Sequence, residues 1–177
     1  MCHIRKALLL LVILALVGCD HATKHAAKIA LEGKTPLTLV EGVLSITYAE
    51  NRGIAFSMLQ YLPEHVSTPL LSGLAVIAVT AIAAVWWKRR RTTCMEHAGF
   101  ALVVAGAVGN LIDRAARGYV VDFIHLRFWP IFNVADIWIV VGGALLMIAA
   151  WRHRRRTRAA GATAREPVPV CQRRPAP

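Results

Sequence analysis

Four long apolar blocks divide this chain, and helices this apolar are typical of proteins that cross a membrane. The blocks cover residues 7–19, 70–87, 98–112 and 134–151, and the first can be extended to residue 31. A helix that crosses the hydrocarbon core of a bilayer needs about 20 mostly apolar residues. The second block approaches this length alone, and the others reach it with their flanks. We therefore expect a membrane protein with several helical spans.

The overall composition also favours a membrane protein over a soluble domain. Of the 177 residues, 56% are apolar and only 18% are charged, whereas soluble domains are less apolar and about 25% charged. We expect an all-α membrane protein with four transmembrane helices and a small extracytoplasmic β-sheet, formed by residues 1–152. Residues 153–177 are rich in arginine and proline, so we expect them to be a disordered, basic cytoplasmic tail.

The net charge of +11 is distributed unevenly along the chain. Lysine and arginine cluster at residues 5–6, at residues 88–91 and from residue 152 onward, and four crossings would put these clusters on one side. Most of the acidic residues fall on the other side. Because basic residues are retained on the cytoplasmic side, both termini are expected in the cytoplasm. The basic excess then reflects topology and contact with anionic membrane lipids, and we expect no nucleic-acid partner.

Two segments are expected on the outer face, at residues 32–69 and 113–133. In the first, apolar and polar residues alternate from Leu44 to Tyr48, which predicts a strand. Residues 51–53 are typical of a turn, and residues 54–56 are a second short extended run. We expect a small sheet at about residues 36–58, with an interfacial stretch at residues 58–62. The second segment mixes aromatic and cationic residues, which suits the lipid headgroup level.

Asp122 and Asp136 each lie beside an apolar block, on the same outer face. Ionised carboxylates are costly at the edge of a bilayer, so they are candidates for a functional site. The simpler interpretation is that each acid caps a helix or pairs with an arginine. Two carboxyl groups that share one proton can, however, activate water and protonate a leaving amine. We therefore predict an intramembrane aspartyl peptidase with Asp122 and Asp136 as its catalytic pair.

Two further groups of polar residues lie in or beside apolar blocks. Asn110, Asp113 and Arg114 follow one another at the end of the third block and can form a hydrogen-bonded network. We expect Arg114 to hold a carboxylate or a substrate carbonyl, and Asp113 to orient its partners. Asp20 and Lys24 are four residues apart in the first block, which predicts an ion pair on one helix face.

Five short motifs in this order resemble the bacterial lipoprotein signal peptidases (signal peptidase II). The likeness extends over about residues 5–152 and leaves out the basic tail. The motifs are Asp20-His-Ala-Thr-Lys24, Asn51-Arg-Gly-Ile-Ala-Phe-Ser57, Gly106-Ala-Val-Gly-Asn110 with Asp113-Arg114, Val121-Asp122-Phe123, and Trp129-Pro-Ile-Phe-Asn133-Val-Ala-Asp136.

The resemblance implies an activity and a set of site residues. Enzymes of this family remove the signal peptide of a diacylglyceryl-modified prolipoprotein, just before the lipidated cysteine. They act at the outer face of the bacterial cytoplasmic (inner) membrane without a metal or organic cofactor, and we expect this chain to act as a monomer. Asp122 and Asp136 match the catalytic aspartates. The positions that match supporting residues are Asp20, Lys24, Asn51, Gly53, Asn110, Arg114, Asn133 and Ala135.

Two alternatives follow from the same residues. Leu16-Val17-Gly18-Cys19 is similar to the lipobox of a lipoprotein, so the chain could itself be cut before Cys19. That cut would remove part of the first span, and the remaining spans would then lack their first packing partner. The acids could instead relay protons in a small carrier or channel. Four short spans without an inverted repeat leave little room for alternating access, so we favour the peptidase.

Overall fold

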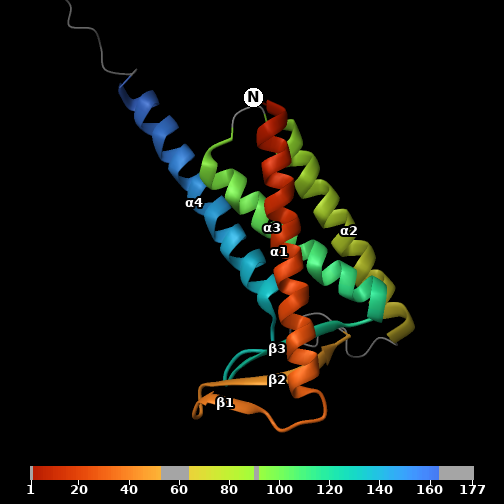
Figure 1. Cartoon of the computed structure of the whole chain (residues 1–177). Helices are drawn as coiled ribbons and strands as arrows, with labels where there is room; N and C mark the ends of the chain where they lie inside the picture. Colours follow the sequence, from red (N-terminus) through yellow and green to blue (C-terminus); the bar gives the residue numbers. More distant parts are fainter. Residues whose placement is uncertain (1, 53–63, 90–91, 164–177) are drawn as a thin grey trace, which may run out of the picture.

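The computed structural model describes residues 2–52, 64–89 and 92–163. Four helices pack side by side, and a three-stranded antiparallel sheet in the order β1-β2-β3 lies at one end of them (Figure 1). The chain is thus mostly helical with a small sheet, as the sequence predicts. The elements are α1 (Cys2–Leu31), β1 (Leu37–Val40), β2 (Leu44–Asn51), α2 (Glu64–Lys88), α3 (Cys94–Arg117), β3 (Val120–Leu126) and α4 (Val134–Thr163).

Three of the helices are long and apolar enough to cross a membrane within the described residues. Their apolar parts are Leu8–Leu31 in α1, Cys94–Arg117 in α3 and Val134–Thr157 in α4. The apolar part described for α2, Ser72–Lys88, is shorter than a typical span. The structure therefore supports a membrane-embedded protein, while the predicted fourth span is not confirmed.

Helix α3 packs against α1, α2 and α4, and small residues set its distance from α4. A Cβ atom at Gly142 would lie 2.7 Å from the carbonyl oxygen of Gly99, and one at Gly106 would collide with the carbonyl oxygen of Ala135. The two backbones can approach this closely only because these positions lack side chains, as is common between membrane helices. The outer faces carry exposed apolar residues such as Leu11 and Met147, which suits contact with lipid.

The observed sheet includes a strand, β3, that lies outside the predicted residues 36–58. Strand β2 confirms the strand predicted at Leu44–Tyr48 and continues to Asn51. Strand β3 was not predicted, because its sequence is a short apolar run around one aspartate rather than an alternating pattern. Its pairing with β2 buries it and sets Ala49 opposite Asp122. The predicted extended run at residues 54–56 and the stretch at 58–62 lie outside the described residues.

Helix α4 continues beyond its apolar part into the basic tail. Residues 153–163 are helical, although their composition predicts disorder. Arginine and alanine are good helix formers, so a helix that leaves the bundle can continue through them. The guanidinium of Arg155 stacks over the ring of Trp151 at 4.1 Å, which adds a local contact. Residues 164–177 lie outside the described part of the chain.

Candidate active site

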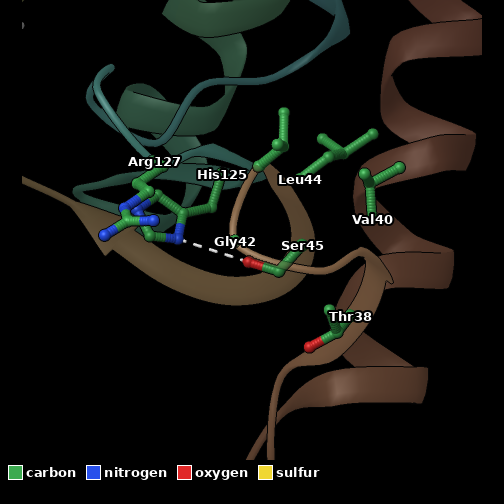
Figure 2. Close-up of a pocket in the computed structure, with 8 residues that line it drawn as sticks. Thr38, Val40, Gly42, Leu44, Ser45, His125 and Arg127 are labelled. Carbon is green, nitrogen blue, oxygen red and sulfur yellow. Dashed lines mark hydrogen bonds between the residues drawn. The ribbon is translucent and has the colours of Figure 1, made fainter.

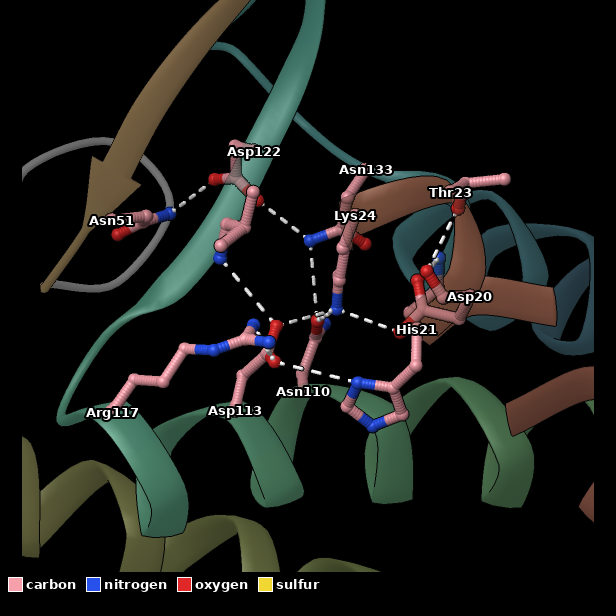
Figure 3. Close-up of polar contacts among 12 residues, drawn as sticks. Asp20, His21, Thr23, Lys24, Asn51, Asn110, Asp113, Arg117, Asp122 and Asn133 are labelled. Atoms are coloured by element: carbon pink, nitrogen blue, oxygen red, sulfur yellow. Dashed lines mark hydrogen bonds and ion pairs between the residues drawn. The ribbon is translucent and has the colours of Figure 1, made fainter. Parts of the chain in front are cut away.

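Asp122 lies on strand β3 of the sheet and is buried, with a relative exposure of 2%. It comes from β3, and β2 supplies its first partner, because Nδ2 of Asn51 donates to Oδ2 of Asp122 at 2.8 Å. Nδ2 of Asn133 donates to Oδ1 at 2.6 Å. Both amides point at the carboxyl group from opposite sides (Figure 3). Each oxygen of this carboxyl group therefore has one neutral donor.

Asp136 lies in the first turn of α4, where it forms a reciprocal cap with Asn133. The backbone amide of Asp136 donates to Oδ1 of Asn133 at 3.1 Å, and the backbone amide of Asn133 donates to Oδ2 of Asp136 at 3.2 Å. This is the geometry of a capping box. Nδ2 of Asn110 donates to the other oxygen, Oδ1 of Asp136, at 2.8 Å. The positive end of the helix dipole also favours negative charge at this position.

Asn133 and Asn110 connect the two aspartates into one site. Asn133 contacts Asp122 through its side chain and Asp136 through its backbone, and its Nδ2 also donates to Oδ1 of Asn110 at 3.2 Å. Burial raises the pKa of Asp122 to about 6, and the charge of Asp136 acts in the same direction. The hydrogen bonds from Asn51 and Asn133 lower it and only partly offset burial. The charge of Asp136 is thus close enough to influence the ionisation of Asp122.

Lys24 is the centre of a second, fully buried cluster beside the aspartate pair. Its Nζ lies 2.7 Å from Oδ2 of Asp20 and 3.0 Å from Oδ2 of Asp113, and it donates to Oδ1 of Asn110 at 2.9 Å. This confirms the predicted ion pair between Asp20 and Lys24. Oδ1 of Asp20 accepts from the backbone amide of Ala135 at 3.0 Å. The cluster therefore joins α1 to α3 and to the start of α4, the helix that carries Asp136.

A missing side chain on α3 makes room for this cluster. A Cβ atom at Gly109 would lie 2.6 Å from Oδ2 of Asp20. Such a contact would push the carboxylate away from Lys24. The motif glycine next to Asn110 is thus explained by the close approach of α1 rather than by backbone flexibility.

Arg117 and His21 also contact the site, although neither was predicted to belong to it. Arg117 NH1 lies 2.7 Å from Oδ1 of Asp113, and Nδ1 of His21 lies 3.6 Å from the same oxygen. The backbone amide of Val121 donates to Oδ2 of Asp113 at 3.5 Å. The four-residue spacing between Asp113 and Arg117 was the signal that could have identified this pair. Arg117 keeps Asp113 paired on the side that faces away from Lys24.

The predicted site residues that the structure describes meet at one end of the helical bundle. Arg114 is half-buried and interacts electrostatically with the carboxylates of Asp113, Asp122 and Asp136. Asp113 forms ion pairs with Lys24 and Arg117 and lies 3.6 Å from His21. Gly53 lies outside the described residues. The predicted residues that the structure brings together are Asp20, Lys24, Asn51, Asn110, Asp113, Arg114, Asp122, Asn133, Ala135 and Asp136.

A separate hollow of about 170 Å³ lies on the sheet. Its polar side is a cross-strand row in which Ser45 pairs with Thr38 on one side and with His125 on the other. Oγ of Ser45 and Nδ1 of His125 are 3.3 Å apart, and Arg127 lies beside them (Figure 2). Because side chains alternate along a strand, His125 and Asp122 point to opposite faces of β3. This hollow is therefore distinct from the aspartate site.

The fold and the site define a membrane-embedded protein with paired carboxyl groups at one end of its helices. The family model described as Signal peptidase (SPase) II matches residues 12–152. The chain therefore belongs to the signal peptidase II family, and the resemblance seen in its motifs is confirmed.

Relatives and solved structures agree with this assignment. A lipoprotein signal peptidase of Pelodictyon phaeoclathratiforme is 39% identical over 77% of this chain and 86% of its own length. One from Streptococcus thermophilus is 35% identical over 84% of this chain and 95% of its own length. Two solved structures of bacterial membrane enzymes superpose with a TM-score of 0.70 each, at 27% and 28% identity. They cover 82% and 81% of this chain, and 88% and 92% of their own chains.

Proposed function

We propose that this protein is an aspartic endopeptidase that removes the signal peptide from diacylglyceryl-modified prolipoproteins, cutting just before the lipidated cysteine. The observation that carries the proposal is the double contact of Asn133, which bonds to both Asp122 and Asp136. The family assignment supports a peptidase, and the name of its relatives, lipoprotein signal peptidase, supports this class of substrate.

In the proposed mechanism, the resting pair holds one proton, on Asp122, while Asp136 is ionised. Asp136 takes a proton from water as the water oxygen attacks the scissile carbonyl carbon. Asp122 gives its proton to the carbonyl oxygen, which forms a neutral tetrahedral diol. The diol then collapses as Asp136 returns its proton to the amide nitrogen, the C–N bond breaks, and a diol proton goes to Asp122. The pair ends in its starting state.

The contacts of the two carboxyl groups support this division of roles. Asp122 has a raised pKa because it is buried, so it can keep a proton near neutral pH better than an ordinary carboxyl group. Asp136 has two amide donors and lies at a helix N-terminus, which stabilises its charge. We propose that Arg114, which interacts with both carboxylates, holds the substrate carbonyl, and that Gly53 supports the substrate.

The placement of the enzyme in the membrane is also part of the proposal. We propose four spans, with α2 as the additional one, and both termini in the cytoplasm of a bacterial cell. The basic part of α4 and the sheet lie at opposite ends of the bundle (Figure 1), which supports a site at the outer face of the inner membrane. We propose that the protein acts as a monomer in contact with membrane lipids.

The test is cleavage of a lipid-modified prolipoprotein by the purified protein in detergent. Wild type is expected to release a signal peptide whose mass places the cut just before the modified cysteine. Asp122→Asn and Asp136→Asn should each reduce cleavage below detection while the protein stays folded. Glu41→Gln is the matched control, because it removes an exposed carboxylate from the hairpin between β1 and β2. Normal cleavage by either aspartate variant would refute the catalytic pair.

A further inference from the structure

A further chain of polar contacts lies at the C-terminal end of β2 and does not include the two aspartates of the proposed catalytic pair. Nζ of Lys28 on α1 donates to the hydroxyl of Tyr119 at 3.4 Å, and the hydroxyl oxygens of Tyr119 and Tyr48 are 3.5 Å apart. The hydroxyl of Tyr48 donates to Oε1 of Glu50 at 3.1 Å, and Arg52 donates to Oε2 of Glu50 at 3.0 Å. We call these five residues the tyrosine cluster. It connects α1, β2 and the residue that precedes β3.

The two hydroxyl protons of this cluster can be assigned so that its four hydrogen bonds form together. Tyr48 has a single hydroxyl proton, which goes to Glu50, so Tyr119 gives its own proton to Tyr48 and accepts from Lys28. The chain of bonds then runs from an ammonium group to a carboxylate, and such charge-assisted chains are mutually strengthening. The guanidinium of Arg52 also lies 5.7 Å from the centre of the Tyr119 ring. Two independent contacts therefore link Tyr119 to the end of β2.

The tyrosine cluster and the catalytic site lie on opposite faces of the same end of β2. Side chains alternate along a strand, so Tyr48 and Glu50 point away from the face that Ala49 and Asn51 occupy. Ala49 is opposite Asp122, and Asn51 is opposite Val120. The tyrosine cluster thus contacts the face of β2 opposite to Asn51, at the end of the strand where Asn51 donates to Asp122.

We propose that Tyr119 and Tyr48 are positioning residues for the cleavage reaction, which act by holding Asn51 against the carboxyl group of Asp122. The inference rests on the proposed peptidase function and adds two residues to its machinery. Among the described residues neither tyrosine contacts Asp122 or Asp136, and β2 carries both Tyr48 and Asn51, so we expect their effect to pass through Asn51. A purely structural role for the same residues would affect folding stability alone.

The pH dependence of the reaction separates these two roles. The groups around Asp122 are Asn51 from β2, Arg114 from α3, Lys24 from α1, and Asn133 with Asp136 at the start of α4. Among them, Asn51 is the one next to the tyrosine cluster. Its hydrogen bond lowers the pKa of Asp122. Loosening that bond therefore raises this pKa, and Asp122 keeps its catalytic proton to a higher pH.

The experiment measures cleavage of a lipid-modified prolipoprotein by the full-length enzyme between pH 5 and pH 9. Tyr119→Phe and Tyr48→Phe remove only the hydroxyl groups. Each is expected to lower the maximal rate about threefold to tenfold and to move the alkaline limb of the profile up by about half a pH unit. Ser45→Ala is the matched control, because it removes a hydroxyl from the distant end of β2. Its profile should coincide with that of wild type.

A double variant tests whether the effect passes through Asn51. In an Asn51→Ala background, Tyr119→Phe should cause no further shift of the limb. A shift that persists there, or tyrosine variants whose profile coincides with wild type, would overturn the inference. If Tyr119→Phe fails to fold, Glu50→Gln tests the same chain of bonds from its exposed end. A wild-type enzyme that does not cleave would refute the proposed function instead.

Discussion

Asn133 donates a hydrogen bond from its side-chain amide to Oδ1 of Asp122 over 2.6 Å. The same residue caps α4 and accepts from the backbone amide of Asp136. One side chain thus sets the position of β3 relative to the first turn of α4. Because the cap stabilises the first turn of α4, a single residue holds the carboxyl groups of both Asp122 and Asp136 by hydrogen bonds.

Asn133→Ala removes the bond to Asp122 and the cap of α4 together. Each lost hydrogen bond is worth about 0.5–1.5 kcal/mol, so the cleavage rate should fall about 10- to 100-fold. Cleavage of a lipid-modified prolipoprotein by the purified variant measures this. Asn133→Asp keeps the shape but loses the side-chain donors, and it should be impaired as well. A rate within twofold of wild type for both variants would contradict the bridging role.

Cleavage should slow as the pH rises through about 6. The pKa of Asp122 is raised to about 6 by burial and by the charge of Asp136. Since the proposed mechanism needs the proton on Asp122, activity is present below this pKa and is lost above it. Initial rates at saturating substrate between pH 4 and pH 9 would test this. A rate that increases through pH 6 would assign the opposite role to Asp122.

Asp122→Asn should remove a loss of stability that wild type undergoes as the pH rises from about 4 to about 7. In the folded protein the pKa of Asp122 is raised from 3.8 to about 6. Stability from this group is therefore fully present below pH 3.8, decreases through that window, and is lost above pH 6. The variant should gain stability relative to wild type between pH 4 and pH 7, by up to about 3 kcal/mol. Thermal unfolding in detergent at both pH values provides the measurement, and a constant difference would contradict the prediction.

Lys24→Met should strongly destabilise the folded protein. Lys24 is fully buried between Asp20 and Asp113, and its loss leaves two buried carboxylates without their shared cation. Breaking a buried ion pair in this way costs about 3–5 kcal/mol. Lys34→Met is the matched control, because Lys34 is exposed. The melting temperature of both variants in detergent is the readout, and equal values would argue against the buried cluster.

Gly109→Ala should disrupt the contact between α1 and α3. The added Cβ atom would lie 2.6 Å from Oδ2 of Asp20, so either the carboxylate or the helix has to move. Gly143→Ala on α4 is the matched control, because a Cβ atom there meets nothing within 4 Å. The control should be neutral or slightly stabilising, since alanine is the better helix former by about 1 kcal/mol. Similar melting temperatures for both variants would contradict the close approach.

Local sequence patterns predicted the parts of the fold that depend on neighbouring residues. Apolar blocks of suitable length predicted the helices, and alternation predicted β2. The ion pair between Asp20 and Lys24 followed from a spacing of four residues on one helix. These features were accessible because both partners lie within one or two helical turns, or within one strand, where geometry is nearly independent of the rest of the protein.

Tertiary structure decided what the local patterns could not reach. Strand β3 is a strand because β2 pairs with it, and Asn51 reaches Asp122 across 71 residues of chain. The bond from Ala135 to Asp20 joins residues 115 positions apart. In α4, continuation of the helix overrode the disorder predicted for residues 153–163. The sequence by itself determined a helical membrane protein with its candidate acids, whereas only packing could bring those acids together, because contacts between distant residues are not encoded in any local period.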